Sequence, residues 1–183
     1  MKIEPQKKRI LFIEIVGIFF ISLSGSSLHF AFEWLGRWPP SALIAAVNES
    51  VWEHLKLAFW PGMIFAIISY PILKNKTKNF WTAKTAGLYA MPIVIVVMFY
   101  SYLAIAGKSN LAYDISTFVL AVSAGQLLSY HLMIKDIHQR SVKIISVALL
   151  IIITAAFCLF TFLPPKFPLF RDFITGKYGI IRN

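Results

Sequence analysis

Five long apolar runs divide this chain, and no other feature of the sequence limits its fold as strongly. Several of them reach the roughly 20 residues that an α-helix needs to cross the hydrocarbon core of a bilayer. Polar or basic segments separate the runs, which lie at about 10–34, 55–73, 86–106, 111–134 and 144–163. The sequence therefore predicts an all-α fold, a polytopic membrane helical bundle of about five transmembrane helices.

The composition argues against a soluble domain and against nucleic-acid binding. Charged residues make up only 14% of the 183 residues, whereas soluble domains carry roughly a quarter. The net charge of +10 would suggest a nucleic-acid partner in a soluble protein. Here the basic residues lie mostly between the apolar runs, where membrane topology explains them better. We therefore expect the lipid bilayer as a partner and no nucleic acid.

Lysine and arginine are unevenly divided between the two ends of the predicted bundle. Before the tail, one end of the bundle has only three basic residues, Arg37, Lys56 and Lys108, whereas the other end has eleven. Because cytoplasmic segments are enriched in Lys and Arg, the N-terminus is predicted in the cytoplasm and the tail outside. We expect residues 1–163 to form the bundle and residues 164–183 to form an interfacial tail that can fold back as a lid. The basic end holds Lys2, Lys7, Lys8, Arg9, Lys74, Lys76, Lys78, Lys84, Lys135, Arg140 and Lys143.

The connection between the first two runs contains unusual punctuation. Pro39 and Pro40 end the first helix, because adjacent prolines cannot continue it. The apolar stretch 42–47 is too short to span and predicts a re-entrant or interfacial half-helix. Ser50 and Glu53 then fit a capping box at the start of the next helix.

Ionisable side chains gather at the predicted outer end of the bundle. His29 and Glu33 are four residues apart, so a helix places them on one face. Glu49 and Glu53 have the same spacing. Ionisable groups within a bilayer usually face the bundle interior or a water-filled cavity, so these two pairs are expected to meet over an outer vestibule. By contrast, Glu14 is interpreted as a solvated residue near the cytoplasm.

Further polar residues extend this predicted site. Lys56 continues the stripe of Glu49 and Glu53, and His54 is expected to point elsewhere on that helix. Asp114 joins from the fourth span, and Asp172 arrives if the tail folds back. The candidate binding residues are therefore Asn48, Trp52, His54, Lys56, Asp114 and Asp172.

These residues support more than one kind of chemistry. In acid–base catalysis, His29 would carry the proton, Glu33 would orient it, and Glu49 or Glu53 would be the second acid or base. Histidine with several carboxylates also suits zinc, manganese or iron, although His-Glu-x-x-His is absent. Transport would use the same groups to bind an ion or a polar head. A purely structural interpretation also stays open, because acids stabilise a helix N-terminus.

The motif from Asn48 to Lys56, with His29-x-x-x-Glu33 upstream, resembles a family of small uncharacterised bacterial membrane proteins. The tail motif Pro-Leu-Phe-x-Asp-x-x-Thr-Gly-x-Tyr-Gly-Ile belongs to the same resemblance, which covers nearly the whole chain. It implies a multi-pass protein of the bacterial plasma membrane and brings no activity. His29, Glu33 and Glu49 also resemble the outline of sterol isomerases of the emopamil-binding type. That likeness implies proton transfer inside a membrane cavity.

The leading hypothesis from the sequence is a membrane-embedded enzyme that acts on a lipid or other amphiphile from the outer side. Its expected catalytic residues are His29, Glu33, Glu49 and Glu53. The alternatives are a small-solute transport or substrate-binding component and a structural accessory subunit. The sequence names no substrate, cofactor or oligomeric state.

Overall fold

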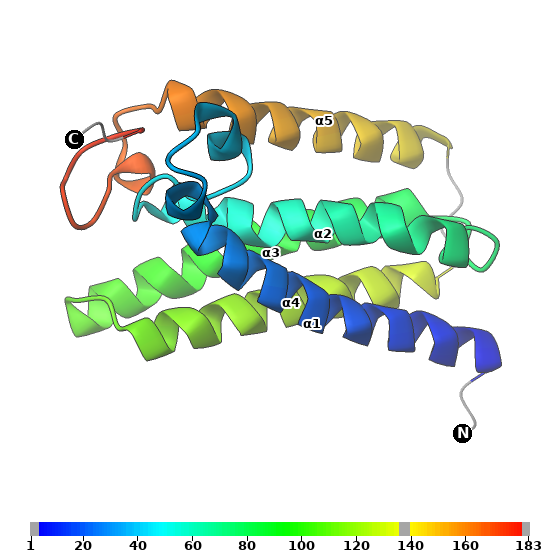
Figure 1. Cartoon of the computed structure of the whole chain (residues 1–183). Helices are drawn as coiled ribbons and strands as arrows, with labels where there is room; N and C mark the ends of the chain where they lie inside the picture. Colours follow the sequence, from blue (N-terminus) through cyan, green and yellow to red (C-terminus); the bar gives the residue numbers. More distant parts are fainter. Residues whose placement is uncertain (1–3, 136–139, 181–183) are drawn as a thin grey trace.

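The computed structural model describes residues 4–135 and 140–180, and within them the chain forms five long α-helices (Figure 1). Each is long and apolar enough to cross a membrane, which confirms the predicted all-α bundle. Lys2 and residues 136–139 of the predicted 135–143 loop lie outside the described residues. The helices are α1 (Pro5–Trp34), α2 (Val51–Leu73), α3 (Phe80–Ala106), α4 (Leu111–Met133) and α5 (Arg140–Phe162).

Two short 3₁₀ helices lie at one end of the bundle. They are η1 (Pro39–Leu43), between α1 and α2, and η2 (Pro168–Phe170), after α5. Figure 1 shows η1, the turn between α3 and α4, and the C-terminal tail together at this end, which we call the tail end. The N-terminus lies at the opposite end, which we call the N-terminal end. Its assignment to the cytoplasm remains a prediction.

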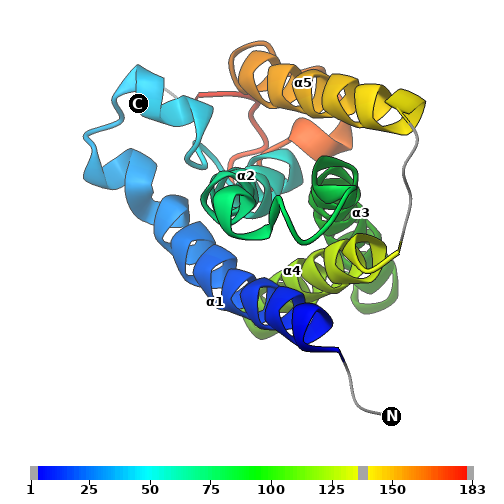
Figure 2. The same ribbon diagram turned by 90° about the vertical axis from the view of Figure 1, so that its right-hand side faces the viewer.

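Helix α2 forms the centre of the bundle. Figure 2 shows it surrounded by the other four helices. In its most apolar segment 56% of the residues are buried, against 22–28% in the other helices. Its buried side chains Leu55, Phe59 and Phe65 pack with Ile21 of α1 and Met91 of α3 in the main hydrophobic core. The position of α2 matters because the Asn48–Lys56 motif covers the residues just before this helix and its first turns.

Glycines allow the helices to approach closely. A Cβ atom on Gly87 of α3 would lie 2.6 Å from the carbonyl oxygen of Gly125 on α4, and one on Gly25 of α1 would lie 2.4 Å from the carbonyl oxygen of Leu57 on α2. Small residues at such contacts are typical of membrane helix packing. The contact at Gly25 holds α1 against the first turns of α2, and His29 follows one turn later.

The expectation of a solvated Glu14 is wrong. Its side chain is fully buried, and its two carboxylate oxygens lie 2.6 and 2.7 Å from Lys84 Nζ. Lys84 belongs to α3 and is itself buried, although the sequence suggested a loop lysine. A buried charge is tolerated when it is paired and hydrogen-bonded, and the two helices provide that pair.

The structure also replaces the predicted half-helix at 42–47. The helical turn is η1, which begins at the two prolines and ends at Leu43. Proline is suited to the first turn of a helix, because its missing N–H would have no partner there. Residues 44–50 then continue as non-helical chain into α2.

Candidate functional site

Two histidines and a glutamate meet at the tail end of the bundle. His29 comes from α1, Glu49 from the loop before α2, and His54 from the first turn of α2. The two Nε2 atoms lie 3.2 Å apart. Glu49 Oε2 lies 3.6 Å from His29 Nε2 and 3.4 Å from His54 Nε2. These three residues are called the His–Glu–His cluster below.

Local capping explains why Glu49 and His54 meet. Ser50 is the N-cap of α2, and its hydroxyl accepts a hydrogen bond from the Glu53 N–H. Glu49 therefore precedes the helix, and its side chain is free to turn back toward the first helical turn. There His54 Nδ1 lies 2.8 Å from the Ser50 carbonyl oxygen. A carbonyl can only accept, so Nδ1 carries a proton and Nε2 faces the cluster.

The tail holds the loop of Glu49 in place. The Glu49 backbone N–H donates to Asp172 Oδ2 at 2.8 Å. The Asn48 side-chain amide donates to the Gly179 carbonyl at 2.8 Å. Asp172 in turn accepts hydrogen bonds from Ile174 and Thr175, so a tight turn of the tail is built on the same carboxylate. Asp172 thus holds the backbone of Glu49 in place.

A second polar group of the motif, Glu53 with Lys56, forms a buried ion pair. Lys56 Nζ is 2.6 Å from Glu53 Oε2, and both side chains are buried. Lys56 also donates to the Ala42 carbonyl of η1 and to the Thr161 hydroxyl of α5. Glu53 Oε2 accepts from the Val47 N–H at 3.1 Å. The Glu53–Lys56 pair therefore links η1 and α5 to α2, and we call these two residues the brace.

Only one half of the predicted capping box forms, because Glu53 belongs to the brace. Its first half is present, since Ser50 caps the helix. In the second half, the Glu53 carboxylate would accept from the Ser50 N–H, but that N–H donates to Asn48 Oδ1 at 2.9 Å. The Trp52 ring packs against Phe157 and Phe170 at centroid distances of 4.8 Å.

Glu33 faces away from the cluster. Its carboxylate forms an exposed ion pair with Arg37. Glu33 Oε1 lies 2.8 Å from Arg37 Nη2 and 2.9 Å from Arg37 Nε. The carboxylate that lies beside His29 is therefore that of Glu49, not that of Glu33. Trp34 and Trp38, which follow Glu33 and Arg37 in the sequence, are also exposed.

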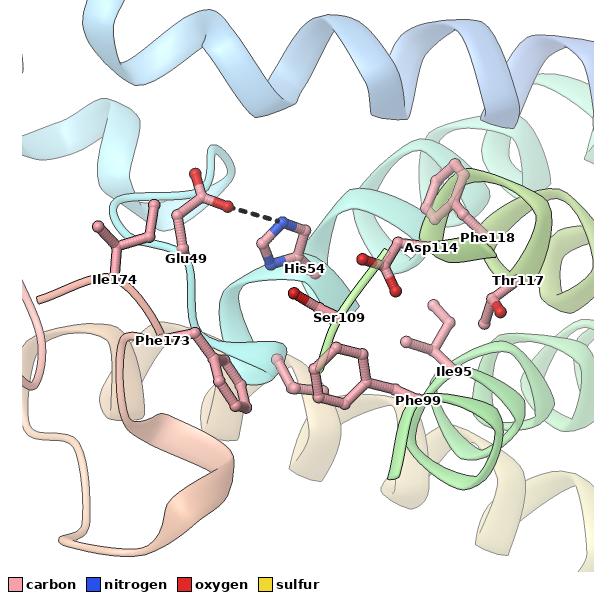
Figure 3. Close-up of a pocket in the computed structure, with 11 residues that line it drawn as sticks. Glu49, His54, Ile95, Phe99, Ser109, Asp114, Thr117, Phe118, Phe173 and Ile174 are labelled. Carbon is pink, nitrogen blue, oxygen red and sulfur yellow. Dashed lines mark ion pairs between the residues drawn. The ribbon is translucent and has the colours of Figure 1, made fainter. Parts of the chain in front are cut away.

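A cavity of about 220 Å³ opens beside the cluster (Figure 3). Glu49, His54, Ser109 and Asp114 supply polar groups, and Figure 3 shows the carboxylate of Asp114 across from the His54 ring. Asp114 Oδ1 is buried and has no hydrogen-bond partner among the described residues. The remaining wall is mainly apolar and consists of Val51, Ile95, Phe99, Thr117, Phe118, Phe173 and Ile174.

Electrostatics favour a charged cluster at neutral pH. The His29 ring first, and the His54 ring next, favour the carboxylate form and hold the pKa of Glu49 well below its usual range, although partial burial opposes them. Burial likewise tends to raise the pKa of Asp172, but the hydrogen bonds from Thr175, Glu49 and Ile174 outweigh it and leave the pKa lowered. Both groups are therefore anionic at neutral pH.

The comparisons with known proteins agree with the whole-chain resemblance. A family model described as a family of unknown function, DUF6512, matches residues 1–180. The chain belongs to this family. No curated protein and no solved structure matches it. The likeness to sterol isomerases therefore remains an interpretation of three residues, one of which, Glu33, lies outside the cluster.

Sequence reasoning placed His54 among binding residues but turned it away from the site. A signal for its true position was available in the capping pattern. If Ser50 is the N-cap, Glu49 precedes the helix, and helical spacing cannot place it on a stripe with Glu53. The contact between His29 and His54 depends on how α1 crosses α2, which the sequence pattern does not specify.

Proposed function

We propose that this protein is a membrane-embedded enzyme in which the His–Glu–His cluster acts on the polar head of an amphiphile. The main supporting observation is that Glu49 and His54 of the cluster line a cavity that combines polar groups with a mainly apolar wall. An amphiphile needs both environments at once. A lipid or lipid-like molecule is therefore the substrate class that best matches the lining.

The size of the cavity limits how much of the substrate it encloses. Its volume of about 220 Å³ is below the roughly 300–1,000 Å³ of typical small-molecule sites. It would hold the reactive end of the amphiphile while the chain stays in the bilayer. Phe173 and Ile174 of the tail line the cavity, and Phe173 packs on Phe99 with ring centroids 5.2 Å apart. The tail would therefore act as a lid.

The chemistry supported by these side chains is proton transfer to or from a water molecule or a headgroup atom. Imidazole transfers protons near neutral pH, and Glu49 orients both rings. Asp114 has an unpaired oxygen on the cavity side and supplies a second acid or base across the substrate. Glu53 and Lys56 leave the catalytic set, because the brace uses both.

Location follows from the same proposal. The basic N-terminal end would face the cytoplasm, and the cavity at the tail end would open on the outer side of a bacterial plasma membrane. The cluster would then meet amphiphiles of the outer leaflet.

The test is turnover in lipid nanodiscs. Purified protein is incubated with a bacterial lipid extract, and the extract is compared before and after by mass spectrometry. Wild type is expected to convert at least one amphiphile, and His54→Ala to do so more slowly by a factor of about 10²–10⁴, the usual contribution of an acid–base group. His131→Ala is the matched control, because His131 is an exposed histidine at the other end of α4. No conversion by wild type, or equal conversion by His54→Ala, would contradict the proposal.

A further inference from the structure

The His–Glu–His cluster has the dimensions of a metal site. Its three ligand atoms, His29 Nε2, His54 Nε2 and Glu49 Oε2, are separated by 3.2, 3.4 and 3.6 Å. A point at the centre of that triangle lies about 2.0 Å from every corner, close to the roughly 2.0–2.2 Å of zinc–nitrogen and zinc–oxygen bonds. We propose that His29, Glu49 and His54 together bind one zinc ion, which deepens the proposed function at the same site.

The separations favour a tetrahedral ion. Ligand atoms about 2.05 Å from a tetrahedral centre are about 3.3 Å apart, while neighbouring ligands of an octahedron with bonds of about 2.1 Å are about 3.0 Å apart. All three observed distances exceed the octahedral value and lie around the tetrahedral one. Two imidazoles and one carboxylate also form a known ligand set of catalytic zinc.

Hydrogen bonding can hold the three atoms together only if at least one Nε2 atom carries a proton that points into the cluster. A cation at the centre satisfies all three acceptors together. His54 is already in the required tautomer, because its Nδ1 proton goes to the Ser50 carbonyl. Metal-binding histidines usually show such a partner on the other ring nitrogen.

The position of the cluster leaves room for a fourth ligand. Glu49 and His54 both line the cavity, so an ion held by them has an open side toward the substrate. A water molecule bound there would have its pKa lowered toward about 7, which makes it a nucleophile at neutral pH. Asp114, with its unpaired oxygen on the cavity wall, could accept the proton of that water. With zinc bound, both Nε2 atoms are ligands, so the bound water and Asp114 would transfer the proton in place of the imidazoles. The zinc ion would therefore direct the proposed enzyme toward hydrolysis of an amphiphile.

The test is metal binding by the full chain in detergent. Protein is stripped with a chelator and titrated with Zn²⁺, and bound metal is measured by elemental analysis after desalting. Wild type is expected to bind one zinc per chain. His29→Ala, Glu49→Gln and His54→Ala are each expected to weaken binding by at least about 100-fold, beyond the usual effect of losing a ligand's hydrogen-bond partner. His131→Ala should bind as wild type does.

Two further measurements keep folding and function separate from metal binding. Each variant must keep the helical circular dichroism and the elution volume of wild type, and His54→Gln repeats the test with a side chain that fills more of the space. Thr117→Phe should keep zinc and lose turnover, because Thr117 lines the cavity outside the three ligands.

Several results would overturn the zinc site. These are the absence of bound zinc in wild type, equal affinity in the three ligand variants, or iron bound in its place. If turnover still depends on His54 without zinc, the inference fails and the proposed function stands. If zinc binds as expected but no amphiphile is converted, the proposed function fails and the zinc site stands.

Discussion

Removal of one charge from the brace should destabilise the protein far more than removal of both. Lys56→Met leaves the Glu53 carboxylate with no counter-ion, and that side chain is only 2% exposed. Breaking a buried ion pair by removing one partner typically costs about 3–5 kcal/mol. For a chain of this size, about 1 kcal/mol corresponds to about 2–4 °C in Tm. The expected decrease in Tm is therefore about 6–20 °C.

The double variant Glu53→Gln/Lys56→Met removes both charges and should recover most of this loss. The remaining amide can still contact the Thr161 hydroxyl and the Val47 N–H, which are the partners of Glu53 now. The assay is thermal unfolding in detergent, followed by circular dichroism. Lys84→Met breaks the other buried pair, with Glu14, and provides a matched control for general destabilisation.

Limited proteolysis separates the two pairs. Because Lys56 contacts η1 and α5, its loss should expose the tail and the loop of Glu49 to protease, whereas Lys84→Met should leave that end protected. The reasoning is refuted if Lys56→Met lowers Tm by less than about 2 °C, or if the double variant is as unstable as the single one.

Three smaller predictions concern other parts of the molecule. Asp172→Asn replaces the carboxylate that holds the Glu49 loop with a neutral amide and should increase proteolysis of the tail. The pKa of Asp172 is lowered by folding, so its stabilisation is full above the ordinary value of about 3.9 and is lost as pH falls through the lower folded value. The Tm of the wild type should therefore decrease when the pH is lowered below about 4, and this decrease should be smaller in Asp172→Asn. Gly125→Val places a Cβ atom 2.7 Å from the Gly87 carbonyl oxygen and should lower stability by about 1–3 kcal/mol, measured by thermal unfolding beside Ser116→Val on the exposed face. Glu33→Gln removes an exposed ion pair with Arg37 and should change stability by less than about 1 kcal/mol; a larger loss would show that this pair is structural.

The fold was predictable from the length of the apolar runs. A segment of about 20 apolar residues in a bilayer must be helical, because its backbone groups need internal partners. Helix ends were predictable where local chemistry decides them, as at Ser50 and at Gly107, whose positive φ of 70° ends α3. The start of α3 was less predictable, because in the sequence Lys84 continues the run of polar residues. Its pairing with Glu14 on another helix explains why it belongs to α3.

The site was predictable in its residue types and less so in its partners. The concentration of acidic and histidine side chains at one end pointed to His29 and Glu49, which do meet. Glu53 and Lys56 have the same polar character, but the brace uses them because η1 and α5 cover that face of α2. Pattern alone cannot separate these cases, since the difference lies in contacts made more than 100 residues away, at Thr161 and Asp172.

The central claim is that the cavity beside the His–Glu–His cluster holds the amphiphile. Its most direct test is the mass-spectrometric measurement of amphiphiles that co-purify with wild type, Thr117→Phe and Ser116→Phe. Thr117 lines the cavity, while its neighbour Ser116 is exposed on the outside of α4. We predict a retained amphiphile in wild type and Ser116→Phe, and its loss in Thr117→Phe. Equal retention by all three proteins would contradict the account.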